Sequence, residues 1–186
     1  MTIQNVLADA NTKMNKAVEV AKEDFAAIRT GRAHPSMFAK IMVDYYGTAT
    51  PLSQLATVQV PEARLALITP YDKGATAAIE KSIRESDLGV NPSNDGVSIR
   101  INFPQLTEER RKEYIKLAKS KGEDSKVSIR NIRRSVKEAL EKMEKDGDIS
   151  KDDLARAEKE LEKHTGDHTT KIDELLKHKE AELLEV

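Results

Sequence analysis

The chain has 186 residues, enough for one or two domains; 34% of them are charged and 4% are aromatic. Because it has no Cys, disulfides, thiolate catalysis and zinc–thiolate sites are excluded, and the scarcity of aromatic residues argues against binding single-stranded nucleic acid by base stacking. No apolar run approaches membrane-spanning length, and the first residues, MTIQNVLADANTKMNK, lack the apolar core of a signal peptide, so we expect a cytoplasmic protein with no membrane association.

Residues 3–29 are predicted to form an amphipathic helix. Apolar residues recur in it at the three- and four-residue spacing of one helix face. They are Ile3, Leu7, Ala10, Met14, Val18, Ala21, Phe25 and Ile28. Gly31 and Pro35 follow closely and disfavour continuation of the helix.

Residues 31–104 have a different composition, with short runs rich in β-branched residues between Gly and Pro. The predicted strands are Ile41–Tyr46, Thr57–Val60, Arg64–Thr69 and Val97–Phe103. One helix is predicted over Ala75–Ser86, and Pro104 closes the segment. This pattern indicates a small α+β domain inserted between helices.

The stretch from Leu106 to Asp146 predicts one long, proline-free helix, with Thr107 as N-cap and Glu108 and Glu109 in the first turn. At ~1.5 Å per residue it is roughly 60 Å long, too long for the core of a compact domain. One predicted buried seam runs along it. Its members are Ile115, Ala118, Gly122, Ser125, Ile129, Ile132, Val136, Ala139 and Met143.

A basic stripe is predicted on one side of the same helix. It consists of Lys112, Lys116, Lys119, Lys126, Arg130, Arg133 and Lys137, with Arg134 beside them. Such a run is commonly a solvated face with local ion pairs. Against that interpretation, Arg130, Arg133 and Lys137 have no acidic residue four positions before them. The like-charged neighbours cost some stability, which an anionic partner would explain, and Arg suits phosphate because its planar group donates two hydrogen bonds.

A final helix is predicted after the turn at Asp146–Asp148, capped by Ser150 with Asp153 as the second member of a capping box. Its central HTGDHTT segment contains poor helix formers, so we expect a bend or fraying there. Residues 147–186 carry 12 acidic and 7 basic side chains, whereas residues 105–146 carry 13 basic and 9 acidic ones. A basic helix thus precedes an acidic one, and the two could pair with each other or leave the basic face free.

These elements predict an α+β protein: an elongated three-helix bundle from residues 1–30 and 105–186, and an inserted β/α/β domain from residues 31–104. Two connections join the domains and form a candidate hinge. Its residues are Thr30, Gly31, Pro104 and Gln105.

No catalytic or cofactor motif is found. His164 and His168 are four residues apart, but no third ligand is evident, so we expect no metal site. Asn91–Gly96 resembles the start of a calcium loop, but Pro92 lies inside it and Asn102 replaces the final Glu, which favours a turn. Tyr45 and Tyr46 could form a contact surface, although a strand alternating between core and edge is the simpler interpretation. The sequence has no glycine-rich phosphate loop or nucleophile elbow, so we predict a non-enzyme without cofactors.

Several segments together resemble the bacterial-type ribosome recycling factor family over essentially the whole chain. They are IRTGRAHPS (28–36), YYGTATPLSQLA (45–56), SDLGVNPSNDG (86–96), FPQLTEERRKEY (103–114) and VSIRNIRRSVKEAL (127–140). Two positions depart from the family pattern: Ala49 stands where Pro is frequent and His34 where Ser is common. Neither is a basic contact residue.

The resemblance implies an L-shaped, two-domain monomer that binds ribosomal RNA of the large subunit in the post-termination complex. It also implies action with elongation factor G and GTP hydrolysis to separate the subunits. By motif position, the implied RNA contacts are Arg29, Arg32, Arg110, Arg130, Arg133 and Arg134. Lys119, Lys126 and Lys137 join them from the basic stripe. The alternative is a structural coiled-coil adaptor whose basic stripe pairs only with its own acidic helix.

Overall fold

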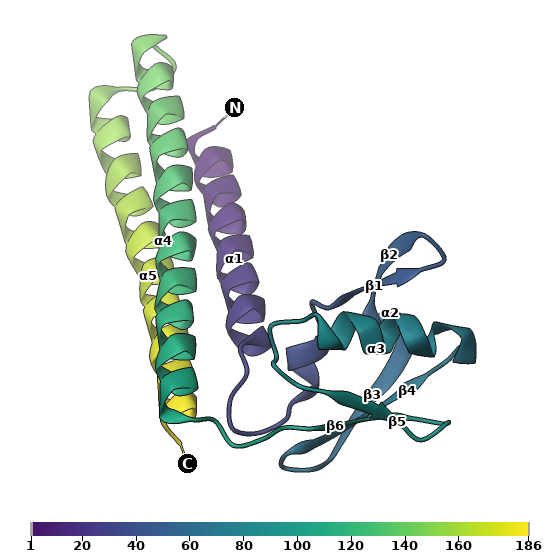
Figure 1. The fold of residues 1–186 in the computed structure, drawn as a ribbon. Helices are drawn as coiled ribbons and strands as arrows, with labels where there is room; N and C mark the ends of the chain where they lie inside the picture. The colour runs from purple at the N-terminus through teal and green to yellow at the C-terminus, as the bar shows by residue number, and fades with distance from the viewer. Residues whose placement is uncertain (1, 186) are drawn as a thin grey trace. The chain divides into compact units, whose positions relative to one another are not determined.

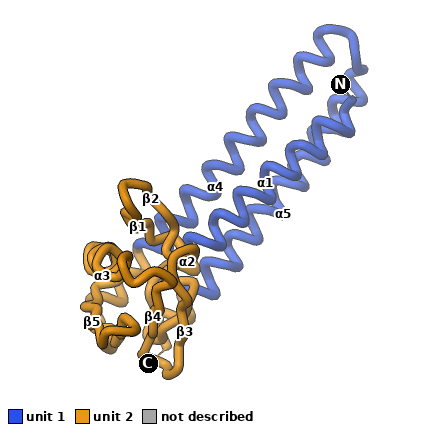
Figure 2. Tube along the Cα trace, turned by 90° about the vertical axis from the view of Figure 1, so that its right-hand side faces the viewer, with its two compact units in different colours: residues 1–25, 117–179 blue, residues 26–116, 180–186 orange. Residues whose placement is uncertain are grey.

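The computed structural model describes residues 2–185, so the first and last residues of the predicted bundle lie outside the described part. Three long helices and a small antiparallel sheet make up the fold (Figure 1), which confirms the predicted α+β class. The chain divides into two compact units, residues 1–25 with 117–179 and residues 26–116 with 180–186 (Figure 2). No helix within residues 2–185 is both long and apolar enough to cross a membrane.

Unit 1 is built from α1 (Ile3–Ala27), α4 (Glu108–Lys145) and α5 (Lys151–Leu184). The end of α1 from residue 26, the start of α4 up to residue 116 and the end of α5 from residue 180 belong to unit 2. The three helices run side by side (Figures 1 and 2). Every member of the predicted α1 stripe is buried except Ile3, which is partly exposed. The apolar stripe of α1 therefore faces the helical core, as its spacing predicts.

The predicted N-caps of α4 and α5 are confirmed, whereas α1 ends at Ala27, two residues before its predicted end at Arg29. Thr107 Oγ1 accepts a hydrogen bond from the Arg110 N–H at 3.1 Å, and Ser150 Oγ accepts one from the Asp153 N–H at 3.1 Å. Gly147 has φ +80°, and the Asp148 N–H donates to the Met143 carbonyl at 2.9 Å. This left-handed glycine and the bond across it end α4.

Two helix predictions are wrong in part. Ala139 is exposed and Leu140 is fully buried instead, because the seam drifts by one residue toward the C-terminal end of α4. The HTGDHTT segment is continuous helix within α5, with Thr165 and His168 buried. Thr165 Oγ1 donates to the Leu161 carbonyl at 2.8 Å, so its polar group is satisfied without breaking the helix.

Unit 2 contains a hairpin and a four-stranded antiparallel sheet. The hairpin is β1 (Met42–Tyr45) with β2 (Thr48–Pro51), and the sheet order is β3-β4-β6-β5. Its strands are β3 (Ala56–Glu62), β4 (Leu65–Pro70), β5 (Pro92–Asn94) and β6 (Ile99–Asn102). The helices are α2 (Leu52–Leu55) and α3 (Thr76–Arg84), with 3₁₀ turns η1 (Pro35–Phe38) and η2 (Lys73–Ala75).

The core of unit 2 is aliphatic with two Phe side chains at its centre. Ile79 and Ile83 of α3 are completely buried, as are Ile99 and Ile101 of β6. The rings of Phe38 and Phe103 meet edge to face, with 6.0 Å between their centres. The sequence predicts four of the strands and α3, but misses β2 and β5, which are only four and three residues long and contain Ala, Pro and Asn, residues of low strand propensity.

Candidate nucleic-acid interface

The basic stripe occupies one flank of α4. At about 100° per residue, Lys119, Lys126, Arg130, Arg133 and Lys137 fall within roughly 60° of arc, and Arg134 is about 60° beyond Lys119. The buried residues Ala118, Ile129 and Val136 are about a quarter turn away. The flank therefore lies next to the helical seam rather than in it. We call the six basic residues on this flank of unit 1 the basic face: Lys119, Lys126, Arg130, Arg133, Arg134 and Lys137.

Three members of the basic face form ion pairs. Lys126 Nζ lies 2.8 Å from the Asp173 carboxylate, Arg133 lies 2.8 Å from Glu162, and Arg130 lies 3.0 Å from Glu123. The absence of an acid four positions earlier thus does not leave Arg130 and Arg133 unpaired, because the partners come from seven residues earlier and from α5. The acidic helix does pair with part of the basic one.

The other three members keep their charges available. Lys119 and Arg134 are exposed, and Lys137 is partly exposed. Within residues 2–185, no ion pair is found for Lys119, Arg134 or Lys137. These three cations, together with the displaceable pairs beside them, make the face capable of binding a polyanion.

Arg29 is placed differently from the other predicted RNA contacts, since it is only 5% exposed. Its guanidinium donates to the Leu88 carbonyl at 3.4 Å and to the Pro104 carbonyl, and it lies 5.4 Å from the centre of the Phe103 ring. Burial lowers the pKa of Arg29, and the nearby Tyr114 opposes that shift. A buried arginine committed to carbonyls and a ring stabilises unit 2 from within.

Arg32 and Arg110 are both exposed, as RNA contacts require. Arg110 lies 3.4 Å from Glu113 one turn later, a weak exposed pair. It precedes Lys119 by nine residues, so it lies on roughly the opposite side of α4. Of the nine predicted RNA contacts, six form the basic face of unit 1, whereas Arg32 and Arg110 are exposed in unit 2 and Arg29 is buried there.

The predicted hinge residues all belong to unit 2. Thr30 is buried, and its hydroxyl donates to the Arg32 carbonyl at 3.2 Å. The bond from Arg29 to Pro104 joins the two connecting segments directly. Tyr114 donates to the Asp87 carbonyl at 3.3 Å, which fixes the first turns of α4 to the same unit. Motion at this hinge stays a prediction.

Of the predicted pair His164 and His168, the His168 ring has a structural role in unit 1. The His168 ring is 2% exposed, with Nε2 2.7 Å from Asn15 Oδ1 of α1 and Nδ1 2.6 Å from the His164 carbonyl. Both ring nitrogens are thus engaged by protein groups. No cluster of three potential metal ligands occurs among residues 2–185.

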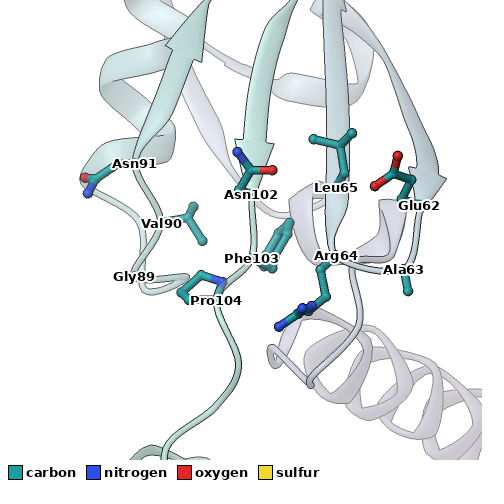
Figure 3. A pocket seen from close by; sticks show the side chains of 10 residues that line it. All are labelled: Glu62, Ala63, Arg64, Leu65, Gly89, Val90, Asn91, Asn102, Phe103 and Pro104. Carbon is teal, nitrogen blue, oxygen red and sulfur yellow. The ribbon is translucent and has the colours of Figure 1, made fainter.

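An open pocket with a volume of about 690 Å³ lies in unit 2, at the ends of β3, β4 and β6 (Figure 3). Its lining residues are Glu62, Ala63, Arg64, Leu65, Gly89, Val90, Asn91, Asn102, Phe103 and Pro104. The lining includes one carboxylate and one guanidinium, but no Ser, Cys, His or Lys that could serve as a nucleophile. It brings together none of the predicted RNA contacts.

A tyrosine cluster on unit 2 was missed as a structural feature. Tyr46, at φ +49° in the β1–β2 turn, is 77% exposed. The hydroxyls of Tyr45 and Tyr46 both donate to Asp72, at 2.9 Å and 3.4 Å. The Gly74 N–H, the Tyr45 hydroxyl and the Tyr46 hydroxyl lower the pKa of Asp72, with Gly74 the largest cause. The sequence pattern could not find this cluster, because Asp72 is remote in the chain.

Comparison with known proteins agrees with this architecture over the whole chain. A sequence model described as Ribosome recycling factor matches residues 21–184. The chain is 64% identical to the ribosome-recycling factor of Streptomyces avermitilis and 63% identical to that of Streptomyces coelicolor, in each case over 99% of this chain and 100% of the relative.

Solved structures are also similar. A solution structure of the ribosome recycling factor is 39% identical with a TM-score of 0.76, covering 100% of this chain and 99% of that one. A second structure presents the T. thermophilus ribosome recycling factor and E. coli elongation factor G bound to the E. coli post-termination complex. It is 43% identical with a TM-score of 0.68, and each chain is covered completely. By sequence and by fold, this chain belongs to the ribosome recycling factor family.

Proposed function

We propose that the protein recycles ribosomes after termination. It binds the large subunit of the post-termination complex and, with elongation factor G and GTP hydrolysis, separates the subunits so that mRNA and deacylated tRNA leave. Family membership over the full chain supports this, as does the relative whose structure is described on the post-termination complex with elongation factor G.

The observation that carries the proposal is the basic face of α4. Within residues 2–185, no ion pair is found for three of its cations, Lys119, Arg134 and Lys137, and all three are at least partly exposed on the continuous helix α4. RNA helices are recognised mainly through phosphates and 2′-hydroxyls, for which positioned Arg and Lys side chains are suited. We propose that Arg32 and Arg110 add contacts outside this face and that Arg29 acts indirectly, by holding unit 2 together.

The energy for separation comes from the GTPase in this mechanism. The sequence has no nucleotide-binding motif, so the factor itself binds RNA and positions its two domains, and it does not hydrolyse GTP in this mechanism. We propose that residues 1–30 and 105–186 hold RNA, and that residues 31–104 move about Thr30, Gly31, Pro104 and Gln105 under the push of the GTPase. This motion has to break the hydrogen bonds from Tyr114 to Asp87 and from Arg29 to Leu88, which cross the hinge. Binding must remain moderate, because the factor has to leave after each round.

The ion pairs between α4 and α5 favour one alternative, a coiled-coil adaptor that uses its charges internally. Binding to purified large ribosomal subunits at increasing salt separates the two. Phosphate contacts release counterions, so the logarithm of a recycling factor's binding constant falls steeply and linearly with the logarithm of the salt concentration. An adaptor shows no saturable binding to large subunits at any salt concentration.

A further inference from the structure

Two carboxylates of α5 occupy the basic face. Glu162 accepts from Arg133 Nη1 at 2.8 Å, and Asp173 accepts from Lys126 Nζ at 2.8 Å. The two acids are eleven residues apart, so they project from α5 within about 20° of each other. All four residues belong to unit 1.

These carboxylates bind the same cations that an RNA phosphate would bind. A carboxylate and a phosphate both present paired anionic oxygens to a guanidinium or an ammonium group, at the same short distance. Arg133 has five N–H donors and Lys126 three, so a phosphate can reach a donor that the carboxylate does not use. It then lies close to Glu162 or Asp173 and is repelled by that negative charge, so the acid competes with the phosphate for the cation.

The acids are suited to displacement rather than to structural support. The Glu162 and Asp173 side chains are 61% and 56% exposed. Within residues 2–185, Arg133 is the only hydrogen-bond partner found for Glu162, and Lys126 the only one for Asp173. Their partners are less exposed, at 21% for the Lys126 side chain and 32% for that of Arg133, so only the acidic half of each pair is fully open to solvent and free to swing away from the cation.

We infer that Glu162 and Asp173 are internal competitors for RNA phosphate, which weaken the grip of the basic face and hasten release of the factor. This inference rests on the proposed function, because it assumes that the basic face meets ribosomal RNA. It assigns to α5 a direct role in turnover, because the carboxylates of α5 lower the affinity of the basic face of α4 for RNA. The separation of acidic and basic residues between the two helices thereby sets this affinity.

The test compares isosteric variants that remove one negative charge. Glu162→Gln releases Arg133, and Asp173→Asn leaves Lys126 with only the longer contact to Glu123, at 4.0 Å. Glu174→Gln and Asp167→Asn are matched controls: they change net charge equally, they are exposed, and they project about 120° and 140° away from Glu162. The binding constant and dissociation rate are measured with purified large ribosomal subunits, and thermal unfolding checks that every variant folds.

We expect each competitor variant to bind about two- to fivefold more tightly and the double variant about tenfold more tightly, mainly through slower dissociation. The controls should stay near the parent protein. In an Arg133→Ala background, the gain from Glu162→Gln should disappear, because no guanidinium remains to be released.

Three results would overturn the inference. Equal gains in the competitor and control variants would mean that only the overall charge matters. An unchanged affinity would mean that RNA does not reach Arg133 and Lys126. A weaker affinity would mean that the carboxylates position the cations for RNA. If the parent protein does not bind large subunits, the proposed function itself fails, a distinct and earlier outcome.

Discussion

The guanidinium of Arg29 lies against the ring of Phe103, with 5.4 Å between its central carbon and the ring centre. Both residues are buried, and Arg29 also donates to the Leu88 and Pro104 carbonyls. One side chain therefore connects the segment after α1, the loop before β5 and the end of β6. An arginine that family resemblance marks as an RNA contact is here part of the core of unit 2.

Arg29→Ala is expected to destabilise the protein by about 1 to 3 kcal/mol. The change leaves two carbonyls without donors and removes the contact with Phe103. Denaturant unfolding measures the loss, and Arg32→Ala, an exposed neighbour, is the control that should leave the unfolding free energy nearly unchanged. Parent-like unfolding of Arg29→Ala together with lost ribosome binding would mean that Arg29 contacts RNA directly.

A second prediction tests which residues of α4 face the buried core of the helices. Ile129 and Leu140 are completely buried, whereas Ile132 is partly exposed and Ala139 is exposed. Ile129→Ala and Leu140→Ala should each cost about 2 to 5 kcal/mol of unfolding free energy. Ile132→Ala should cost clearly less, because part of its side chain already contacts water. If Ile132→Ala lowers the unfolding free energy as much as Ile129→Ala or more, Ile132 lies in the buried seam and the register described for α4 is wrong.

The basic face predicts a separation of binding from stability. In the described part of the chain, no ion pair involves Arg134 or Lys137, so Arg134→Ala and Lys137→Ala should barely change thermal unfolding. Each should weaken binding to the large subunit by about 1 to 3 kcal/mol if it meets a phosphate. Arg84→Ala, an exposed arginine of α3, is the control for loss of one positive charge. An equal loss in that control would contradict a specific face.

Asp72 predicts a dependence of stability on pH. Its pKa is lowered in the folded state, first by the Gly74 N–H and then by the Tyr45 hydroxyl. Its stabilising effect is therefore complete above the unfolded pKa of about 3.9 and is lost as pH falls through the lower folded value. The parent protein should lose its advantage over Asp72→Asn in this acid range. If the difference in unfolding free energy between the parent protein and Asp72→Asn stays constant from neutral pH into acid, the assignment is contradicted.

The sequence predicts the elements with long periodic patterns and fails where contacts link distant segments. The caps at Thr107 and Ser150 are local, so they are readable and confirmed. His168 was expected in a fraying segment, but its bond to Asn15 across 153 residues holds it inside the bundle. Arg133 looks unpaired in the sequence because Glu162 comes from another helix. The burial of Arg29 depends on Leu88 and Pro104, which no local pattern relates to it.

The central claim is tested most directly by subunit separation on purified post-termination complexes. The factor, elongation factor G and GTP are supplied together and then omitted one at a time, and dissociation is followed by light scattering. We expect rapid separation only when all three are present, none with a non-hydrolysable GTP analogue, and a strongly reduced rate with an Arg133→Ala, Arg134→Ala double variant that folds normally. Separation at the full rate without the factor, or with the double variant, would contradict the account.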